Sequence, residues 1–110
     1  MDEIVVLITT GSEAEAKGIA RELVTRELVA CVNVIPGVRS IFRWEGQVVE
    51  EQEVLLVAKT VSQAFERVAT LVKSMHSYSL PEVIALPIQQ GLPEYLSWVQ
   101  DSIKQTGHMT

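Results

Sequence analysis

The stretch "LVACVNVIPGVRSIFRWEGQVVEEQEVLLVAKT", residues 28–60, decides the fold. Its two arms are rich in β-branched and apolar residues, and the "WEGQ" between them contains the glycine of a tight turn. Two such arms around a turn predict a β-hairpin. Pro36-Gly37 interrupts the first arm and predicts a bulge or kink at that point. We therefore expect one long antiparallel hairpin in the middle of the chain.

The residues before the hairpin predict a strand and then a helix. "EIVVLIT" (3–9) is a short apolar run rich in β-branched residues, which is typical of a buried strand. Ser12, followed three residues later by Glu15, has the pattern of a capping box that opens a helix. Apolar residues then recur at helical spacing, and we expect this helix to end near Glu27 or Leu28.

The residues after the hairpin predict a helix, a strand and a last helix. Thr60 with Gln63 forms a second possible capping box, and the apolar face that follows ends with Met75. "EVIALPI" (82–88) predicts the last core strand. Pro93 is well placed in the first turn of a final helix.

The order β-α-β-β-α-β with an added C-terminal helix predicts an α+β fold of the ferredoxin-like, split βαβ type. In this arrangement a four-stranded antiparallel sheet carries its helices on one face. We expect residues 1–110 to form a single domain, with residues 104–110 as a frayed polar tail.

The length of the hairpin predicts an oligomer. An arm from 30 to 43 spans about 46 Å at about 3.3 Å per residue, whereas a chain of this length has a radius of gyration of only about 13 Å. The tip must project from the body or bend back, and a projecting ribbon leaves bare strand edges and apolar side chains in water. We expect a second copy of the chain to cover them.

Composition narrows the class of partner. The formal net charge is −5, and the nine Lys and Arg residues form no basic run. Because nucleic-acid binding depends on positive charge, this acidic chain is a poor candidate for it, and cations are the better charged partners. No run approaches the ~18–20 apolar residues of a membrane span. Cys31 is the single cysteine, which agrees with a cytoplasmic location.

Several dense motifs, in order, resemble those of the CutA-type divalent-cation tolerance proteins. They are "LVACVNVIPGVRSIFRWEGQV", "AKT", "HSYSLPEVIALPI" and "YLSWV", and the resemblance runs from about residue 3 to residue 103. It implies a ferredoxin-like subunit in a stable homotrimer joined through the long hairpins, with an architecture similar to that of the PII signalling proteins. It also implies an association with tolerance to copper and other divalent cations, with no catalytic reaction attached.

The candidate metal ligands are His76, Cys31 and Glu53. Imidazole and thiolate suit copper, and the resemblance implies copper ligands at histidines of the "HSYSLPEV" motif together with a cysteine in the first strand. Here Met75 precedes the histidine and the first strand reads Ile8-Thr9, so two of those donors are absent. Each candidate also has a structural interpretation: His76 ends a helix, Cys31 is a small buried hydrophobe, and Glu53 lies on a solvated strand. For Glu53 the alternative to a solvated position is a cation site between subunits, in which trimer formation brings this carboxylate beside His76 or Tyr78 of a neighbouring copy.

A second candidate site groups Lys59, Tyr78, Glu82 and Trp44. Lys59 ends an otherwise apolar strand and either reaches water or faces a cleft. With the other three side chains it resembles the family's polar cluster at the subunit boundary, a mixture that suits a small anion or metabolite. Pro81 fixes the backbone ahead of Glu82.

Two functions follow. The first is a non-enzymatic trimer with no obligatory cofactor that binds divalent cations, copper foremost, with modest affinity. The second is a PII-like signalling or scaffold trimer that binds a small anionic effector or a partner protein at the cleft between subunits. No spacing typical of Ser/His/Asp or Cys/His catalysis is present in the sequence.

Overall fold

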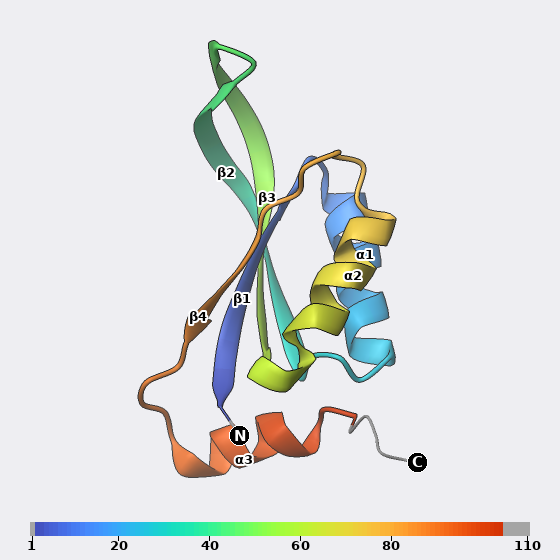
Figure 1. The fold of residues 1–110 in the computed structure, drawn as a ribbon, viewed down its shortest axis with the longest axis vertical. Coiled ribbons are helices and arrows are strands. Elements are labelled where there is room, and N and C mark those ends of the chain that lie inside the picture. The colour runs from blue at the N-terminus through green and yellow to red at the C-terminus, as the bar shows by residue number, and fades with distance from the viewer. Residues whose placement is uncertain (1, 105–110) are drawn as a thin grey trace.

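The computed structural model describes residues 2–104, and within them four strands form one antiparallel sheet accompanied by three α-helices (Figure 1). In chain order the elements are β1 (Glu3–Thr10), α1 (Glu13–Thr25), β2 (Cys31–Trp44), β3 (Gln47–Val61), the short 3-10 helix η1 (Ser62–Ala64), α2 (Phe65–Met75), β4 (Val83–Pro87) and α3 (Pro93–Asp101). The strands are ordered β2-β3-β1-β4, all antiparallel. This order confirms the predicted ferredoxin-like α+β fold.

The core lies between the sheet and the two helices α1 and α2, which cover the same face of the sheet (Figure 1). Alternate residues of β1 and β3 point into it, because successive side chains of a strand face opposite ways. The fully buried side chains include Val6 and Ile8 of β1, Leu56 of β3, Ile19 and Leu23 of α1, and Val68 and Val72 of α2. The other face of the sheet has no helix over its middle, and α3 lies across the end where β1 begins (Figure 1).

The predicted capping box at the start of α1 is confirmed in one of its two bonds. Ser12 Oγ accepts a hydrogen bond from the backbone N–H of Glu15 at 3.2 Å. The Glu15 carboxylate does not return to Ser12 but accepts from the backbone N–H and the hydroxyl of Ser77, at 2.6 and 3.1 Å. The side chain expected to complete the cap therefore ties α1 to the segment after α2.

Helix α1 ends earlier than predicted, at Thr25, in a Schellman motif. The N–H of Glu27 donates to Val24 O, and that of Leu28 donates to Leu23 O. Glu27 takes the left-handed position with a φ of 58°, where glycine is the usual residue. No glycine marks this end in the sequence, which explains the error in the predicted boundary.

The predicted cap at Thr60 is wrong. Thr60 lies within β3 and is fully buried, and its hydroxyl donates to Leu28 O at 2.7 Å. The turn of 3-10 helix at 62–64 intervenes before α2, which begins at Phe65 without a side-chain cap. Met75, the last residue of the apolar face predicted for this helix, is 39% exposed at the last turn of α2.

Strand β4 is an edge strand rather than the core strand that was predicted. Its backbone pairs only with β1 among the described residues, and Ile84 and Leu86 are 49% and 51% exposed. Its continuous apolar run resembled a strand that is buried on both faces, although one face of the described chain is uncovered.

The hairpin β2–β3 extends beyond the helices and forms the projecting end of a body measuring 46 × 31 × 24 Å (Figure 1). The pairing shifts between Ile35 and Val38, which confirms the bulge predicted at Pro36-Gly37. Glu45 and Gly46 close the tip, both with positive φ, as in a two-residue type I′ turn.

Residues 105–110, most of the tail expected to fray, lie outside the described residues. Lys104, the first tail residue, is held by two hydrogen bonds: its N–H donates to Glu27 O at 2.9 Å, and its carbonyl accepts from Arg67 at 3.3 Å. Among the described residues, no helix has both the length and the apolar composition required to cross a membrane.

Candidate cation-binding cleft

A cleft of about 770 Å³ lies between the projecting hairpin and the connection from α2 to β4. Its walls come from β1, from both hairpin arms and from the connection, and they consist of Thr9, Ser40, Ile41, Phe42, Trp44, Val49, Glu51, Glu53, Tyr78, Ser79, Leu80 and Glu82. The lining contains three carboxylates and three aromatic rings, and it contains no lysine, arginine or histidine. Three of the four residues predicted for a ligand cleft, Trp44, Tyr78 and Glu82, are in this set.

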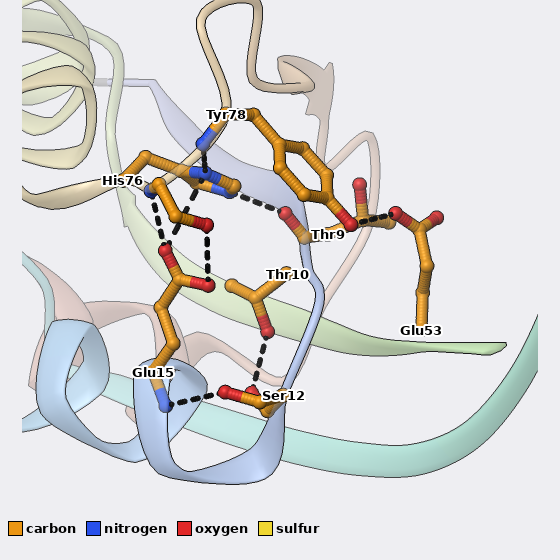
Figure 2. Close-up of polar contacts among 8 residues, drawn as sticks. Thr9, Thr10, Ser12, Glu15, Glu53, His76 and Tyr78 are labelled. Carbon is orange, nitrogen blue, oxygen red and sulfur yellow. Dashed lines mark hydrogen bonds and ion pairs between the residues drawn. The ribbon is translucent and has the colours of Figure 1, made fainter. Parts of the chain in front are cut away.

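Tyr78 joins the two sides of the cleft. Its phenol hydroxyl donates a 2.8 Å hydrogen bond to Glu53 Oε2 on β3 (Figure 2). Glu53 is buried, with 6% exposure, so the solvated position expected for it on the hairpin arm is wrong. Burial first, and then the hydrogen bond and negative charge of Glu53, raise the pKa of Tyr78 to about 12. The phenol is therefore a neutral hydrogen-bond donor at physiological pH.

His76 holds the backbone of Tyr78 in place through a hydrogen bond. The imidazole side chain is 0% exposed, and its Nε2 donates to Thr9 O at 2.7 Å because a carbonyl oxygen can only accept (Figure 2). Its Nδ1 accepts from the backbone N–H of Tyr78 at 3.0 Å. These two bonds define a neutral imidazole with its proton on Nε2. The two rings also touch, with centroids 4.7 Å apart.

Glu15 completes the support of this connection. Its Oε2 lies 3.6 Å from His76 Nδ1 and also accepts from Ser77 N–H, so the start of α1, the end of α2 and the cleft are joined by one set of polar contacts (Figure 2). Gly11 allows the close packing of Tyr78, since a Cβ at this position would lie 3.1 Å from the Tyr78 hydroxyl.

The predicted metal ligands are not brought together in the described part of the chain. Cys31 pairs with Lys59 on β3, six residues from Glu53, a separation of about 20 Å along the strand. The Cys31 thiol instead lies 3.6 Å from the hydroxyl of Tyr95 on α3, a contact that, ahead of burial, raises the pKa of Tyr95. His76 has both ring nitrogens in hydrogen bonds. No group of three or more His, Cys, Asp or Glu side chains within residues 2–104 is placed to hold a metal ion.

Lys59 is the predicted cleft residue that the structure places elsewhere. It lies near the far end of β3, opposite Cys31 and Val5, and its ammonium group donates to the Asn33 amide oxygen. Its absence leaves the cleft lined by acidic, aromatic and apolar side chains.

Thr9, Phe42 and Glu51 also line the cleft, although no motif in the sequence had indicated them. Strand alternation gave a partial signal for Glu51, which is two residues before Glu53 and shares its face. Nothing local indicates that the carbonyl of Thr9 receives the His76 proton, because the two residues meet only through the tertiary fold.

Comparison with known proteins identifies the family. The family model described as "CutA1 divalent ion tolerance protein" matches residues 4–102. The chain belongs to the CutA family. The Divalent-cation tolerance protein CutA of Thermus thermophilus is 51% identical over 100 residues, which cover 91% of this chain and 97% of that protein. The CutA homolog of Xenopus laevis is 48% identical over 98 residues, which cover 89% of this chain and 65% of the longer frog protein.

Solved CutA structures share the whole described fold. The Thermus thermophilus divalent cation tolerance protein superposes with a TM-score of 0.91 at 50% identity, covering 93% of this chain and 99% of that one. CutA1 from Oryza sativa superposes with a TM-score of 0.93 at 38% identity, covering 96% and 97%. This chain therefore has the CutA fold over nearly its whole length.

Proposed function

We propose that this CutA-family protein is a homotrimer that binds divalent cations, copper among them, with modest affinity and without catalysing a reaction. The observation that carries the proposal is the cleft, where Glu51, Glu53 and Glu82 gather with no basic residue in the lining. Carboxylate oxygens are ligands for divalent cations. The names of the relatives, which are divalent-cation tolerance proteins, support the same assignment.

Modest affinity follows from the spacing of the donors. Among the described residues of one chain, no three His, Cys, Asp or Glu side chains are close enough together to hold a metal ion. A cation in the cleft therefore has one or two protein ligands and keeps several of its waters. Copper at His76 would require the Tyr78 N–H to leave Nδ1, so we place the cation at the cleft carboxylates. In the trimer a second copy can add further ligands.

The uncovered sheet face supports the trimer. Its apolar side chains alternate with those of the core and are at least partly exposed: Val5, Leu7, Ile35, Leu55, Val57, Ile84 and Leu86. Within the described chain, the outer edges of β2 and β4 face no further strand, so backbone groups along them are open to pairing. A symmetric assembly of copies that pairs these edges and covers this face removes both liabilities.

The charge of the cleft favours cations over the small anionic effector of a PII-like protein. Lys59, the cation on which an anion site would depend, contacts Asn33 and is absent from the lining. Three carboxylates repel an anion.

Binding rather than catalysis agrees with the surroundings of His76. An imidazole that acts as a general acid or base must reach a substrate, whereas this one is shielded from solvent and uses both nitrogens to hold Thr9 and Tyr78.

The free thiol of Cys31 supports the expected cytoplasmic location, which fractionation of the producing cells will test.

Calorimetric titration of the trimer with Cu²⁺ and with Mn²⁺ tests the proposal, after light scattering has established a mass of three chains. We expect saturable binding of both ions, a loss of about tenfold in affinity in the Glu51→Gln/Glu82→Gln variant, and little change in His76→Gln. A matched control is Glu13→Gln/Glu66→Gln, which removes two exposed helix carboxylates away from the cleft. Binding lost only in His76→Gln, or no binding at all, contradicts the proposal.

A further inference from the structure

Glu53 is a buried carboxylate without a cationic partner. It is 94% shielded and forms no ion pair with the described residues, whose ion pairs involve other glutamates. Only its Oε2 accepts a hydrogen bond from a described residue, from the neutral phenol of Tyr78. Its Oε1 points away from Tyr78 in Figure 2. Every enclosed side-chain oxygen among the described residues has a hydrogen-bond partner, so Oε1, which accepts no hydrogen bond from residues 2–104, is open to the cleft that Glu53 lines. A buried charge of this kind is costly unless a cation compensates it.

The walls around Glu53 are mostly aromatic and aliphatic. Phe42 and Trp44 of β2 line the cleft from the hairpin arm, and Tyr78 and Leu80 line it from the connection. Trp44 is 44% exposed within the single chain, so part of its indole is not covered by its own chain. Aromatic faces attract organic cations through the ring quadrupole, most strongly for tryptophan.

These walls also suit an organic cation. A metal ion bound at the carboxylates keeps its waters and makes no use of the aromatic walls. An alkylammonium or guanidinium group carries its own apolar stem, which can lie against Trp44 and Phe42. A volume of about 770 Å³ is within the range of small-molecule sites.

We propose that the cleft binds a small organic cation of the alkylammonium or guanidinium class. One cationic group donates to the free Oε1 of Glu53, and the stem packs on Trp44 and Phe42. Glu51 and Glu82 provide negative charge for a second cationic group, so a diamine fits better than a monoamine. Tyr78 remains the donor to Oε2 and fixes the carboxylate for this contact. The proposal adds a ligand class to the cleft and does not depend on metal binding.

Calorimetry of the full chain in its native assembly, in buffer with EDTA and no divalent metal, tests the proposal with putrescine as the probe. Two molecules of similar length provide the controls: 1,4-butanediol lacks the charges, and succinate reverses them. We expect saturable binding of putrescine, binding of the diol that is at least about tenfold weaker, and no binding of succinate.

Substitutions identify the group that binds the ammonium. Glu53→Gln keeps the size and the acceptor for Tyr78 but removes the charge, and we expect about tenfold weaker binding of putrescine. Glu50→Gln is the matched control. Glu50 lies on β3 like Glu53, but it is outside the cleft and forms an exposed ion pair with Arg39 of β2. Its replacement should weaken putrescine binding by less than about twofold. If Glu53→Gln does not fold, Glu82→Gln on the exposed side of the cleft and Trp44→Leu replace it, each with an expected loss of about threefold to fivefold.

Three results would overturn the proposal: no binding of putrescine, equal binding of the diol, or full binding retained by the folded cleft variants. Metal titrations are separate experiments in EDTA-free buffer. Failure of putrescine with retained Mn²⁺ binding therefore removes this inference alone, and the reverse result removes only the metal proposal.

Discussion

The backbone N–H of Tyr78 donates a 3.0 Å hydrogen bond to Nδ1 of His76, so a shielded histidine fixes the starting point of the tyrosine that enters the cleft. The same imidazole donates through Nε2 to Thr9 O on β1. His76 thus links the central strand to the connection that carries Tyr78, and its position in the sequence motif has a structural reason that requires no metal.

Replacing His76 by alanine should destabilise the protein by about 1–3 kcal/mol, because Thr9 O and the Tyr78 N–H lose their partner in a shielded place. Denaturant unfolding of the wild type and of the variant measures this difference. Met75→Ala is the control, since Met75 is adjacent but 39% exposed, and we expect it to cost less. Equal small effects of the two substitutions would show that the His76 contacts contribute little.

Tyr78→Phe should change how the stability depends on alkaline pH. The pKa of Tyr78 is raised from 10.0 to about 12 in the folded chain, first by burial and then by Glu53. Between pH 10 and pH 12 the unfolded phenol has lost its proton while the folded one keeps it, so stability falls as pH rises through this window. Unfolding curves across the window should show a smaller decline for Tyr78→Phe. Absorbance titration should show the wild-type phenolate of Tyr78 forming near pH 12; formation near pH 10 would contradict the role of burial and of Glu53.

Gly11→Ala should destabilise the fold through its contact with Tyr78. The new Cβ would lie 3.1 Å from the phenol oxygen, so the ring must move, at a cost of about 1 kcal/mol. In a Tyr78→Phe background this cost should shrink, because the nearest atom has been removed. Gly18→Ala in α1 is the control: nothing lies within 4 Å of its added Cβ, and we expect stabilisation by about 0.5–1 kcal/mol. A double-mutant cycle with no coupling between positions 11 and 78 would argue against the contact.

Glu27→Gly should stabilise the protein by about 0.5–1 kcal/mol, since glycine is unstrained at the positive φ that ends α1. The Schellman bonds of the backbone remain available to glycine. Thr25→Gly, two residues earlier and within the helix, should instead destabilise by a similar amount. Thermal unfolding of the two variants measures both signs, and a loss of stability in Glu27→Gly would contradict the strain at this residue.

The fold was largely predictable because its signals are local. The turn at Glu45-Gly46, the bulge at Pro36-Gly37 and the cap at Ser12 each follow from the conformational preferences of a few residues. The cap assigned to Thr60 was wrong because the buried carbonyl of Leu28 provides a partner that a local pattern cannot reveal.

The cleft was less predictable, because its members come from distant parts of the chain. Trp44, Tyr78 and Glu82 were identified from motifs and lie in the cleft. Lys59 was grouped with them through the family resemblance, although it is six residues from Glu53 on the same strand, about 20 Å away. The burial of Glu53 depends on the connection after α2 folding over the strand. The burial of Glu53 is not contained in a short window of sequence.

The measurement that tests the central claim most directly is a crystal structure of the protein with Cu²⁺, using anomalous scattering at the copper edge. Copper is a demanding probe because it prefers imidazole, so it gives His76 the best chance to act as a ligand. We expect an anomalous peak at the carboxylates of Glu51, Glu53 or Glu82, with the bond from Tyr78 N–H to His76 Nδ1 intact. A peak on the His76 ring with the 77–82 connection displaced would contradict it.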